Sequence, residues 1–362
     1  MSGPPLKVLM STGPLKPMDN PYLRQLVTGL SEQIDVEPLS GRAALFCRPD
    51  VFHVQWPHQL YRAAGRPKTM VKRVLSAVLL ARLRARGVPV VLTVHNVASH
   101  EKEGVVEQRL LRTLERMVTL RIYLNESDEN DPTRGVVILH GDYRAWLRDQ
   151  HVDTSPREPE RDVILFGWLR RYKAIESLIA AARDAEATLT VTGRAIDTSY
   201  EHALRATMAD VPFAMFDPWH REDDELTAEI LRHRLVCLPY PQMYNSGALL
   251  YALSIDRPVL APRSPSNEAI AHEVGEQWLM LYDGPLTAAT LRDALARTPP
   301  AGSPDLSRRD WSTSIALHVA CYRILAGAAD GRRLPPTLSR KLLQADPVFA
   351  AHSAFNAPVQ IL

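Results

Sequence analysis

Short runs of β-branched and apolar residues alternate along this chain with longer segments whose apolar positions recur at helical spacing. In the first half, the strand-like runs are residues 6–10, 34–38, 51–55, 88–94, 120–124 and 136–139. The helix-like segments between them are residues 21–30, 68–86 and 105–117, and Asn20 before Pro21 is a favourable helix cap. This alternation predicts a parallel sheet with crossover helices.

The pattern stops at residues 153–160 (DTSPREPE), a charged and proline-containing segment that we interpret as a linker, and then restarts. The second set of strand-like runs is 163–166, 188–192, 213–216, 235–238, 258–261 and 278–282. The second set of helices is 175–183, 223–232, 247–253, 267–274, 288–296 and 311–325. Two successive sets of this kind predict an α/β protein with two doubly wound domains facing across a cleft, with ligands beyond the carboxyl ends of the strands.

The predicted domains are residues 1–155 and 156–328, with a tail at 329–362 that we expect to pack across them. A chain of 362 residues suits two domains of common size. Its three cysteines are far apart, which indicates a reducing compartment and no disulfide framework. No apolar run approaches the length of a membrane span and no signal peptide is evident, so we expect a soluble, cytoplasmic protein.

Charge is distributed unevenly, although the net charge is only +2. No acidic residue lies between Asp50 and Glu101, whereas eight basic ones do: Arg62, Arg66, Lys68, Lys72, Arg73, Arg82, Arg84 and Arg86. This stretch is either a solvated helix face or a surface for peripheral contact with the inner face of an anionic membrane. No nucleic-acid motif accompanies it, so we expect no nucleic-acid partner.

Two loops of the second half have the character of phosphate-binding loops. Neither a G-x-G-x-x-G nor a G-x-x-x-x-G-K-[ST] fingerprint is present, which disfavours a dehydrogenase or a P-loop kinase. In the segment FGWLRRYK, however, a strand leads through Gly167 toward a helix start beside Arg170 and Lys173, a setting that attracts a diphosphate. In the segment LPYPQMYNSG, Ser246 and Gly247 open another helix, whose free N–H groups would face an anion or would simply be capped.

These segments occur together with LTVTGR, NSGALLYALS and RPVLAP in the second half, and with NPY, DVFHVQWP, TVHN and LHGDYR in the first. In this order and spacing they resemble the donor and acceptor domains of family 4-like GT-B glycosyltransferases, over roughly residues 6 to 325. The resemblance implies two Rossmann-like domains and transfer of a sugar from a nucleotide-diphosphate sugar to a glycolipid, a polysaccharide precursor or a small molecule. It implies neither a cofactor nor a metal.

The resemblance also implies roles for particular residues. The donor would contact Arg170, Lys173, Gly193, Asn245, Ser246, Gly247, Tyr251 and Glu268. His95 at a strand end would face the transferred sugar, with Glu101 as a second catalytic candidate. Asn20, Asn96 and His100 would contact the acceptor.

One departure concerns two glutamates that retaining members carry around the second loop, because Met243 and Tyr251 stand in their places. Gln242 or Asn245 could hold sugar hydroxyls instead, and Glu268 either serves the sugar or charges a helix start. His95 favours a retaining reaction, whereas an inverting one would require Glu101, His95 or Asp19 as general base. A catalytically silent binding protein with the same fold is the alternative from another class.

The acidic run from Glu222 to Glu225 invites a metal site. It lies where a helix is predicted to begin, and we interpret it as first-turn charge. Cationic side chains and a helix dipole would then stabilise the leaving group in place of a metal.

Overall fold

A computed structural model describes residues 5–16, 20–95, 104–127, 129–219, 221–329 and 335–349. The contacts divide the chain into two compact units, which we describe separately. Unit 1 comprises Met1–Gly141 and Arg309–Leu362, and unit 2 comprises Asp142–Arg308.

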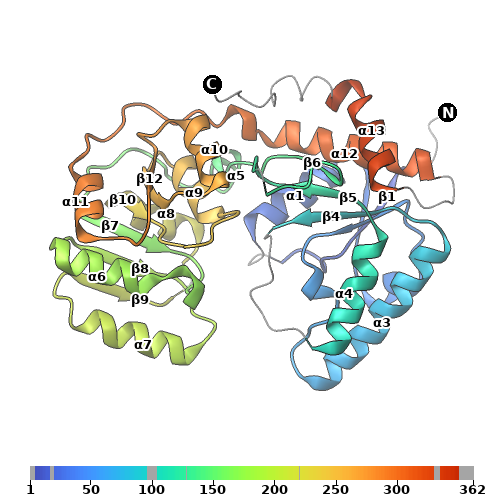
Figure 1. Cartoon of the computed structure of the whole chain (residues 1–362), viewed down its shortest axis with the longest axis horizontal. Coiled ribbons are helices and arrows are strands. Elements are labelled where there is room, and N and C mark those ends of the chain that lie inside the picture. Colours follow the sequence, from blue (N-terminus) through green and yellow to red (C-terminus); the bar gives the residue numbers. More distant parts are fainter. Residues whose placement is uncertain are drawn as a thin grey trace. The chain divides into compact units, whose positions relative to one another are not determined.

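Unit 1 is built on a six-stranded sheet of order β2-β1-β3-β4-β5-β6, in which every pair is parallel (Figure 1). Its strands are β1 (Lys7–Met10), β2 (Asp35–Pro38), β3 (Val51–Val54), β4 (Val90–Val94), β5 (Val118–Tyr123) and β6 (Gly135–Val137). The order reverses between β1 and β3, where Val8 is in register with Val51. A reversal of this kind opens a crevice at the carboxyl ends of the two strands.

Helices cover both faces of this sheet. One face carries α1 (Pro21–Ser31), α12 (Trp311–Ala329) and α13 (Pro336–Gln344), whose apolar side chains share a core with Val8, Val91 and Ile122. The other face carries α2 (Gly41–Phe46), α3 (Arg66–Ala85) and α4 (Val105–Met117), which pack on Leu9, Phe52 and Leu92. A 3-10 turn, η1 (Pro57–Leu60), connects β3 toward α3. The Asn20 side chain accepts the N–H of Tyr22 and caps α1, as predicted.

Unit 2 is a second parallel sheet, of order β12-β11-β10-β7-β8-β9. Its strands are β7 (Arg161–Phe166), β8 (Leu189–Thr192), β9 (Ala214–Asp217), β10 (His233–Cys237), β11 (Val259–Pro262) and β12 (Leu279–Tyr282). This is the doubly wound order that reverses between the first strand, β7, and the fourth, β10.

The helices of unit 2 enclose one apolar core around this sheet. They are α5 (Arg144–Asp149), α6 (Ile175–Ala185), α7 (Thr198–Ala209), α8 (Asp223–Leu231), α9 (Gly247–Ser254), α10 (Pro265–Val274) and α11 (Ala288–Ala296), with the 3-10 turns η2 (Arg171–Lys173) and η3 (Ser307–Arg309). Side-chain caps from Asp197, Ser246, Ser264 and Thr287 fix four of these helix starts.

All twelve predicted strands are present, with ends that differ by a few residues, and the fold class is confirmed. Helices α2, α5 and α7 were not predicted, whereas α13 lies within the tail that we expected to pack as a helix. The division also differs from the expected one, because α12 packs on the core of unit 1 and the chain changes units at Gly141 and Arg309 rather than at residue 155. Buried apolar side chains occupy several sides of α12, so its periodicity does not reveal which sheet it covers.

Within the described residues, no helix is long and apolar enough to cross a bilayer.

Candidate active site

The strand reversal in unit 2 brings two predicted loops to one edge of the sheet. β7 and β10 are hydrogen-bonded neighbours, with Val163 opposite Leu235. The loop after β7 therefore starts beside the loop after β10, and these are the two segments that the sequence singled out. The expectation that they form one ligand site rests on this adjacency.

Glycines allow the loops after β7 and β8 to approach very closely. Gly167 has φ +97° and Gly193 has φ +134°, conformations that side chains rarely tolerate. A Cβ atom on Gly193 would lie 1.9 Å from the carbonyl oxygen of Gly167. Gly193, predicted as a donor contact, thus has a backbone-packing role in this structure, and it holds the loop that carries Arg170 and Lys173.

Lys173 is a buried lysine on the loop after β7. Its side chain is 7% exposed and its Nζ lies 4.5 Å from the centre of the Tyr240 ring, on the loop after β10. Burial, with a smaller contribution from the neighbouring Arg170 charge, lowers the pKa of Lys173 to about 7. Within the described part of the chain, no carboxylate pairs with Lys173 or with Arg170. Two adjacent cations without a counter-ion form a site prepared for an anion.

The start of α9 contributes a second anion-attracting element. Ser246 caps this helix by accepting the N–H of Leu249. The Tyr143 hydroxyl lies 2.9 Å from the position that a Cβ on Gly247 would take, so a larger residue would collide with it. Asn245 lies half-buried just before the cap. The cap satisfies one donor of the first turn, and the other N–H groups of that turn remain oriented outward along the helix axis.

The residues that replace the expected glutamates are built into the fold. Met243 is buried, and its carbonyl oxygen accepts hydrogen bonds from Ser264 and Ser266. The Tyr251 hydroxyl bonds to Thr227 at 2.8 Å and its ring packs in the core, so its contacts are structural although we predicted a donor contact.

Glu268 lies in the first turn of α10 and forms a surface ion pair with Arg263 at 3.1 Å. This arrangement matches the alternative in which Glu268 charges a helix start. The acidic run at residues 222–225 likewise begins α8, as predicted. Among the residues that the structure describes, no three His, Cys, Asp or Glu side chains gather as a metal site would require.

In unit 1, a series of hydrogen-bonded polar side chains reaches His95 from the protein interior. Gln55 is the residue that follows β3. Its side chain accepts a hydrogen bond from His95 Nε2 at 3.0 Å and donates one to His53 Nε2 at 3.2 Å. His53 also contacts Thr93 at 2.8 Å and the hydroxyl of Tyr322 on α12 at 2.6 Å. With the Gln55 amide in this orientation, His95 carries its proton on Nε2, which leaves Nδ1 as a hydrogen-bond acceptor.

Aromatic rings fix the plane of His95. The ring stacks on Trp56 at a centroid distance of 4.5 Å and meets Tyr22 edge-on at 5.5 Å. Burial, followed by the charges of His140 and His58, lowers the pKa of His95 to about 3. His95 is therefore neutral at physiological pH and is a hydrogen-bonding group more than a proton acceptor.

Of the other site residues predicted in the first half of the chain, the structure describes only some. The side-chain oxygen of Asn20 accepts the hydrogen bond that caps α1, so this atom has a structural role. Asn96, His100, Glu101 and Asp19 lie outside the described residues. His95 is the last described residue before one of these gaps.

Three members of the basic stretch are engaged within unit 1. Arg62 and Arg73 both pair with the buried carboxylate of Glu107 on α4, at 3.2 and 2.8 Å. Burial would raise the pKa of Glu107, but hydrogen bonds from Arg62, from the Gly104 N–H and from Arg73 lower it. Arg82 donates to the carbonyls of Ala44 and Cys47. These contacts explain part of the stretch without any partner.

The sequence analysis did not predict the hydrogen bonds that connect His95 to Gln55 and His53, nor the contact between Lys173 and the Tyr240 ring. His53 and Gln55 are both fully buried and stand two residues apart, so they face the same side of the sheet. Two polar residues at that spacing in a buried strand were the available signal. Tyr240 carried no local signal, since its contact with Lys173 joins two separate loops.

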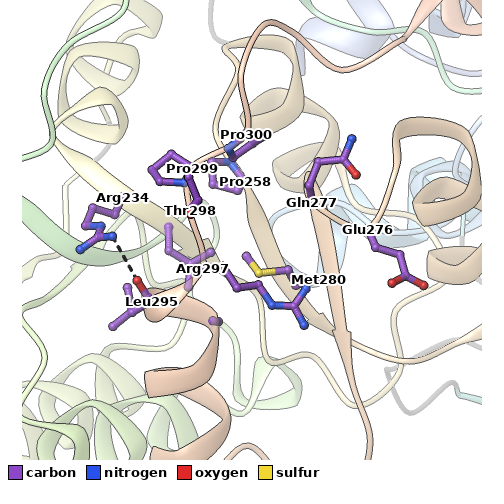
Figure 2. A pocket seen from close by; sticks show the side chains of 12 residues that line it. Arg234, Pro258, Glu276, Gln277, Met280, Leu295, Arg297, Thr298, Pro299 and Pro300 are labelled. Carbon is purple, nitrogen blue, oxygen red and sulfur yellow. Dashed lines mark hydrogen bonds between the residues drawn. The ribbon is translucent and has the colours of Figure 1, made fainter.

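A pocket at the opposite edge of the unit 2 sheet contains none of the predicted residues. It is lined at the amino ends of β10, β11 and β12, where Arg234 donates to the carbonyl of Leu295 at 3.1 Å (Figure 2). Pro258, Pro299 and Pro300 make up much of its wall. Because ligands of doubly wound sheets bind at the carboxyl edge, we do not place the donor here.

Comparison with known proteins adds the following relatives. No protein-family model matches the sequence. Two sequences from Xanthomonas campestris pv. campestris, both named GDP-mannose:glycolipid 4-beta-D-mannosyltransferase, are 38% identical to this chain over 327 residues, which cover 89% of this chain and 93% of theirs.

Solved structures show the same fold at low identity. AviGT4, a glycosyltransferase involved in avilamycin A biosynthesis, is 15% identical with a TM-score of 0.51, covering 89% of this chain and 98% of its own. A UDP-forming α,α-trehalose-phosphate synthase from Burkholderia vietnamiensis is 11% identical with a TM-score of 0.56, covering 90% and 100%.

Proposed function

Because this chain is a GT-B glycosyltransferase of the family that includes the Xanthomonas mannosyltransferases, we propose that it transfers mannose from GDP-mannose to a lipid-linked acceptor. That it is a glycosyltransferase using a nucleotide sugar follows from the family, and the catalytically silent alternative falls with it. The identity of 38% over most of both chains carries the finer proposal.

The leaving GDP is proposed to bind at the carboxyl edge of the unit 2 sheet. Lys173 and Arg170 supply uncompensated positive charge, and the start of α9 at Ser246 and Gly247 supplies backbone donors. Charge that develops on the departing diphosphate is stabilised best by groups already in place. We propose that these groups act without a metal or other cofactor.

The stereochemical course is proposed to be inverting. The relatives are named 4-beta-D-mannosyltransferases. GDP-mannose carries its sugar in the α configuration, so formation of a β linkage requires inversion and a general base. This replaces the retaining course that His95 favoured on sequence grounds.

The base is proposed to be a carboxylate. His95, with a pKa of about 3, is too weakly basic, and its free Nδ1 suits a sugar hydroxyl instead. Glu101 and Asp19, which follow β4 and β1 in the sequence, are the carboxylate candidates. We further propose that Asn96 and His100 contribute acceptor contacts, and that the enzyme works as a peripheral protein on an anionic membrane, through the stretch from Arg62 to Arg86.

The proposal is tested with purified protein, a panel of nucleotide diphosphates and GDP-mannose with membrane lipid extracts. We expect GDP to stabilise the protein most, by about 2.7 kcal/mol at a hundred times its dissociation constant. We also expect mannose to enter the lipid fraction, and Glu101→Gln or Asp19→Asn to abolish transfer without loss of GDP binding. Preference for UDP or ADP would contradict the donor, and full activity of both variants would contradict the base.

A further inference from the structure

The outer face of α3 is an apolar stripe. Pro67, Met70, Val71, Val74, Ala77, Val78 and Ala81 are all exposed and recur at the spacing of one helix face. Met70 is 60% exposed, Val71 59% and Val74 56%. The stripe runs for about 21 Å, at 1.5 Å per residue. The opposite side of the helix already packs into the unit 1 core through Leu79, Leu80 and Leu83, so this helix is apolar on two faces.

Elements beside α3 extend the exposed apolar surface. Phe46, at the end of α2, is 71% exposed, and this end lies beside α3 because Arg82 donates to the Cys47 carbonyl. Val105 and Val106 are exposed at the start of α4, which Arg73 of α3 joins through Glu107. Figure 1 shows α3 and α4 side by side on one face of the unit 1 sheet. Exposed apolar side chains gathered on neighbouring elements in this way mark an interaction site.

Cations stand at both ends of the stripe. Arg66 and Lys68 lie at the start of α3, Arg84 and Arg86 at its end, and all four are exposed. None of them forms a salt bridge within the described residues, in contrast to Arg62 and Arg73. The helix itself contains no acidic residue. An apolar centre with a cationic border complements the anionic headgroups and acyl boundary of a bilayer.

We propose that the α3 stripe inserts into the interface of an anionic membrane, with Arg66, Lys68, Arg84 and Arg86 contacting lipid headgroups. This inference rests on the proposed lipid-linked acceptor and names the surface that brings the enzyme to it. A second copy of the chain is a poorer occupant, because pairing two such helices would bring like charges together. A lipid surface satisfies the apolar and the cationic parts at once.

The proposal predicts that apolar insertion, and not charge alone, holds the protein on the membrane. We would measure co-sedimentation of the full chain with vesicles of phosphatidylcholine alone and of equimolar phosphatidylcholine and phosphatidylglycerol. Val71→Asp combined with Val74→Asp should lower binding to the anionic vesicles at least about tenfold, because the new charges would have to enter the apolar layer. Both positions are exposed, so the fold should tolerate the changes.

Phe213→Asp is the matched control, since Phe213 is 52% exposed on unit 2, and it should bind vesicles like the wild type. Arg66→Gln, Lys68→Gln, Arg84→Gln and Arg86→Gln together should remove the salt-sensitive part of binding only. The proposal is overturned if the Val71 and Val74 variant binds like the wild type, if the wild type ignores anionic vesicles at low salt, or if the stripe instead mediates a dimer in solution.

This test is separable from that of the proposed function. The Val71 and Val74 variant should keep its GDP-induced thermal stabilisation and its transfer to a water-soluble acceptor analogue. Vesicle binding without any use of GDP-mannose would refute the proposed donor and leave the membrane surface standing. Full GDP-mannose activity together with vesicle binding that does not depend on the stripe would refute the membrane surface and leave the proposed donor standing.

Discussion

Replacing Lys173 by methionine is expected to stabilise unit 2 and to weaken the binding of GDP. The lysine is buried, its ammonium group lies over the Tyr240 ring, and the charge of Arg170 lies nearby. Methionine has a similar length, carries no charge and packs well against an aromatic ring. The substitution therefore removes a cost that the fold bears when the site is empty.

The magnitude follows from the pKa. Lowering the pKa from 10.5 to about 7 corresponds to a ceiling of about 5 kcal/mol, at about 1.4 kcal/mol per unit, when the lysine is charged. The attraction between Nζ and the Tyr240 ring offsets about 0.5–2 kcal/mol of this cost. We therefore expect Lys173→Met to raise the free energy of unfolding by about 3 kcal/mol near neutral pH.

The sign of the pH dependence makes this prediction specific. Because the folded-state pKa lies below the unfolded one, the folded protein binds fewer protons between pH 7 and 10.5. The destabilisation is complete below pH 7 and is relieved as the pH rises through that window. The advantage of Lys173→Met should consequently shrink at alkaline pH.

Chemical denaturation followed by circular dichroism at pH 6 and at pH 10 measures this difference. Lys68→Met, at an exposed lysine on α3, is the control and should change stability by no more than about 0.5 kcal/mol. In parallel, GDP affinity should fall roughly tenfold or more, since a charge-assisted contact contributes about 1.5–3 kcal/mol. A Lys173→Met protein that is less stable than the wild type, or that binds GDP as well, would refute the reasoning.

Three further predictions concern the same loops and the chain behind His95. GDP affinity should decrease as pH rises above 7, and the wild type but not Lys173→Met should take up a proton on binding GDP. Calorimetry in two buffers of different ionisation enthalpy measures this uptake, and equal uptake in both proteins would exclude Lys173 as the group that is protonated. Gln55→Leu should slow transfer about tenfold or more with GDP affinity intact, because His95 loses its hydrogen-bonded support; unchanged turnover would make Gln55 merely structural. Gly193→Ala should destabilise by more than about 2 kcal/mol, well beyond Gly284→Ala, whose Cβ would meet no atom; equal effects in denaturation would refute the close approach to Gly167.

Local signals were sufficient for much of the fold. Helices α4 and α11 begin and end at the predicted residues, and Asn20 caps α1 as expected. The loop with Arg170 and Lys173 was proposed as a ligand site from a glycine, two cations and a helix start. Such features are set by neighbours in sequence, which is why the residues alone revealed them.

Features that depend on distant contacts were not predictable in this way. The acid-free stretch suggested eight available cations, but Glu107 engages Arg62 and Arg73 from 45 and 34 residues away. The assignment of α12 to unit 1 depends on packing and on the hydrogen bond between Tyr322 and His53. The position of Tyr240 beneath Lys173 needs the β7–β10 strand pairing, which the sequence pattern does not specify.

The most direct test of the central claim is the anomeric configuration of the product formed from GDP-mannose. Full-length protein, GDP-mannose and a lipid-linked acceptor are incubated, and the new glycosidic linkage is determined by nuclear magnetic resonance. The account predicts a β-linked mannosyl product that Lys173→Met forms more slowly than the wild type. An α-linked product would contradict the inverting course, and no mannosyl transfer with GDP-mannose, alongside activity with another nucleotide sugar, would contradict the proposed donor.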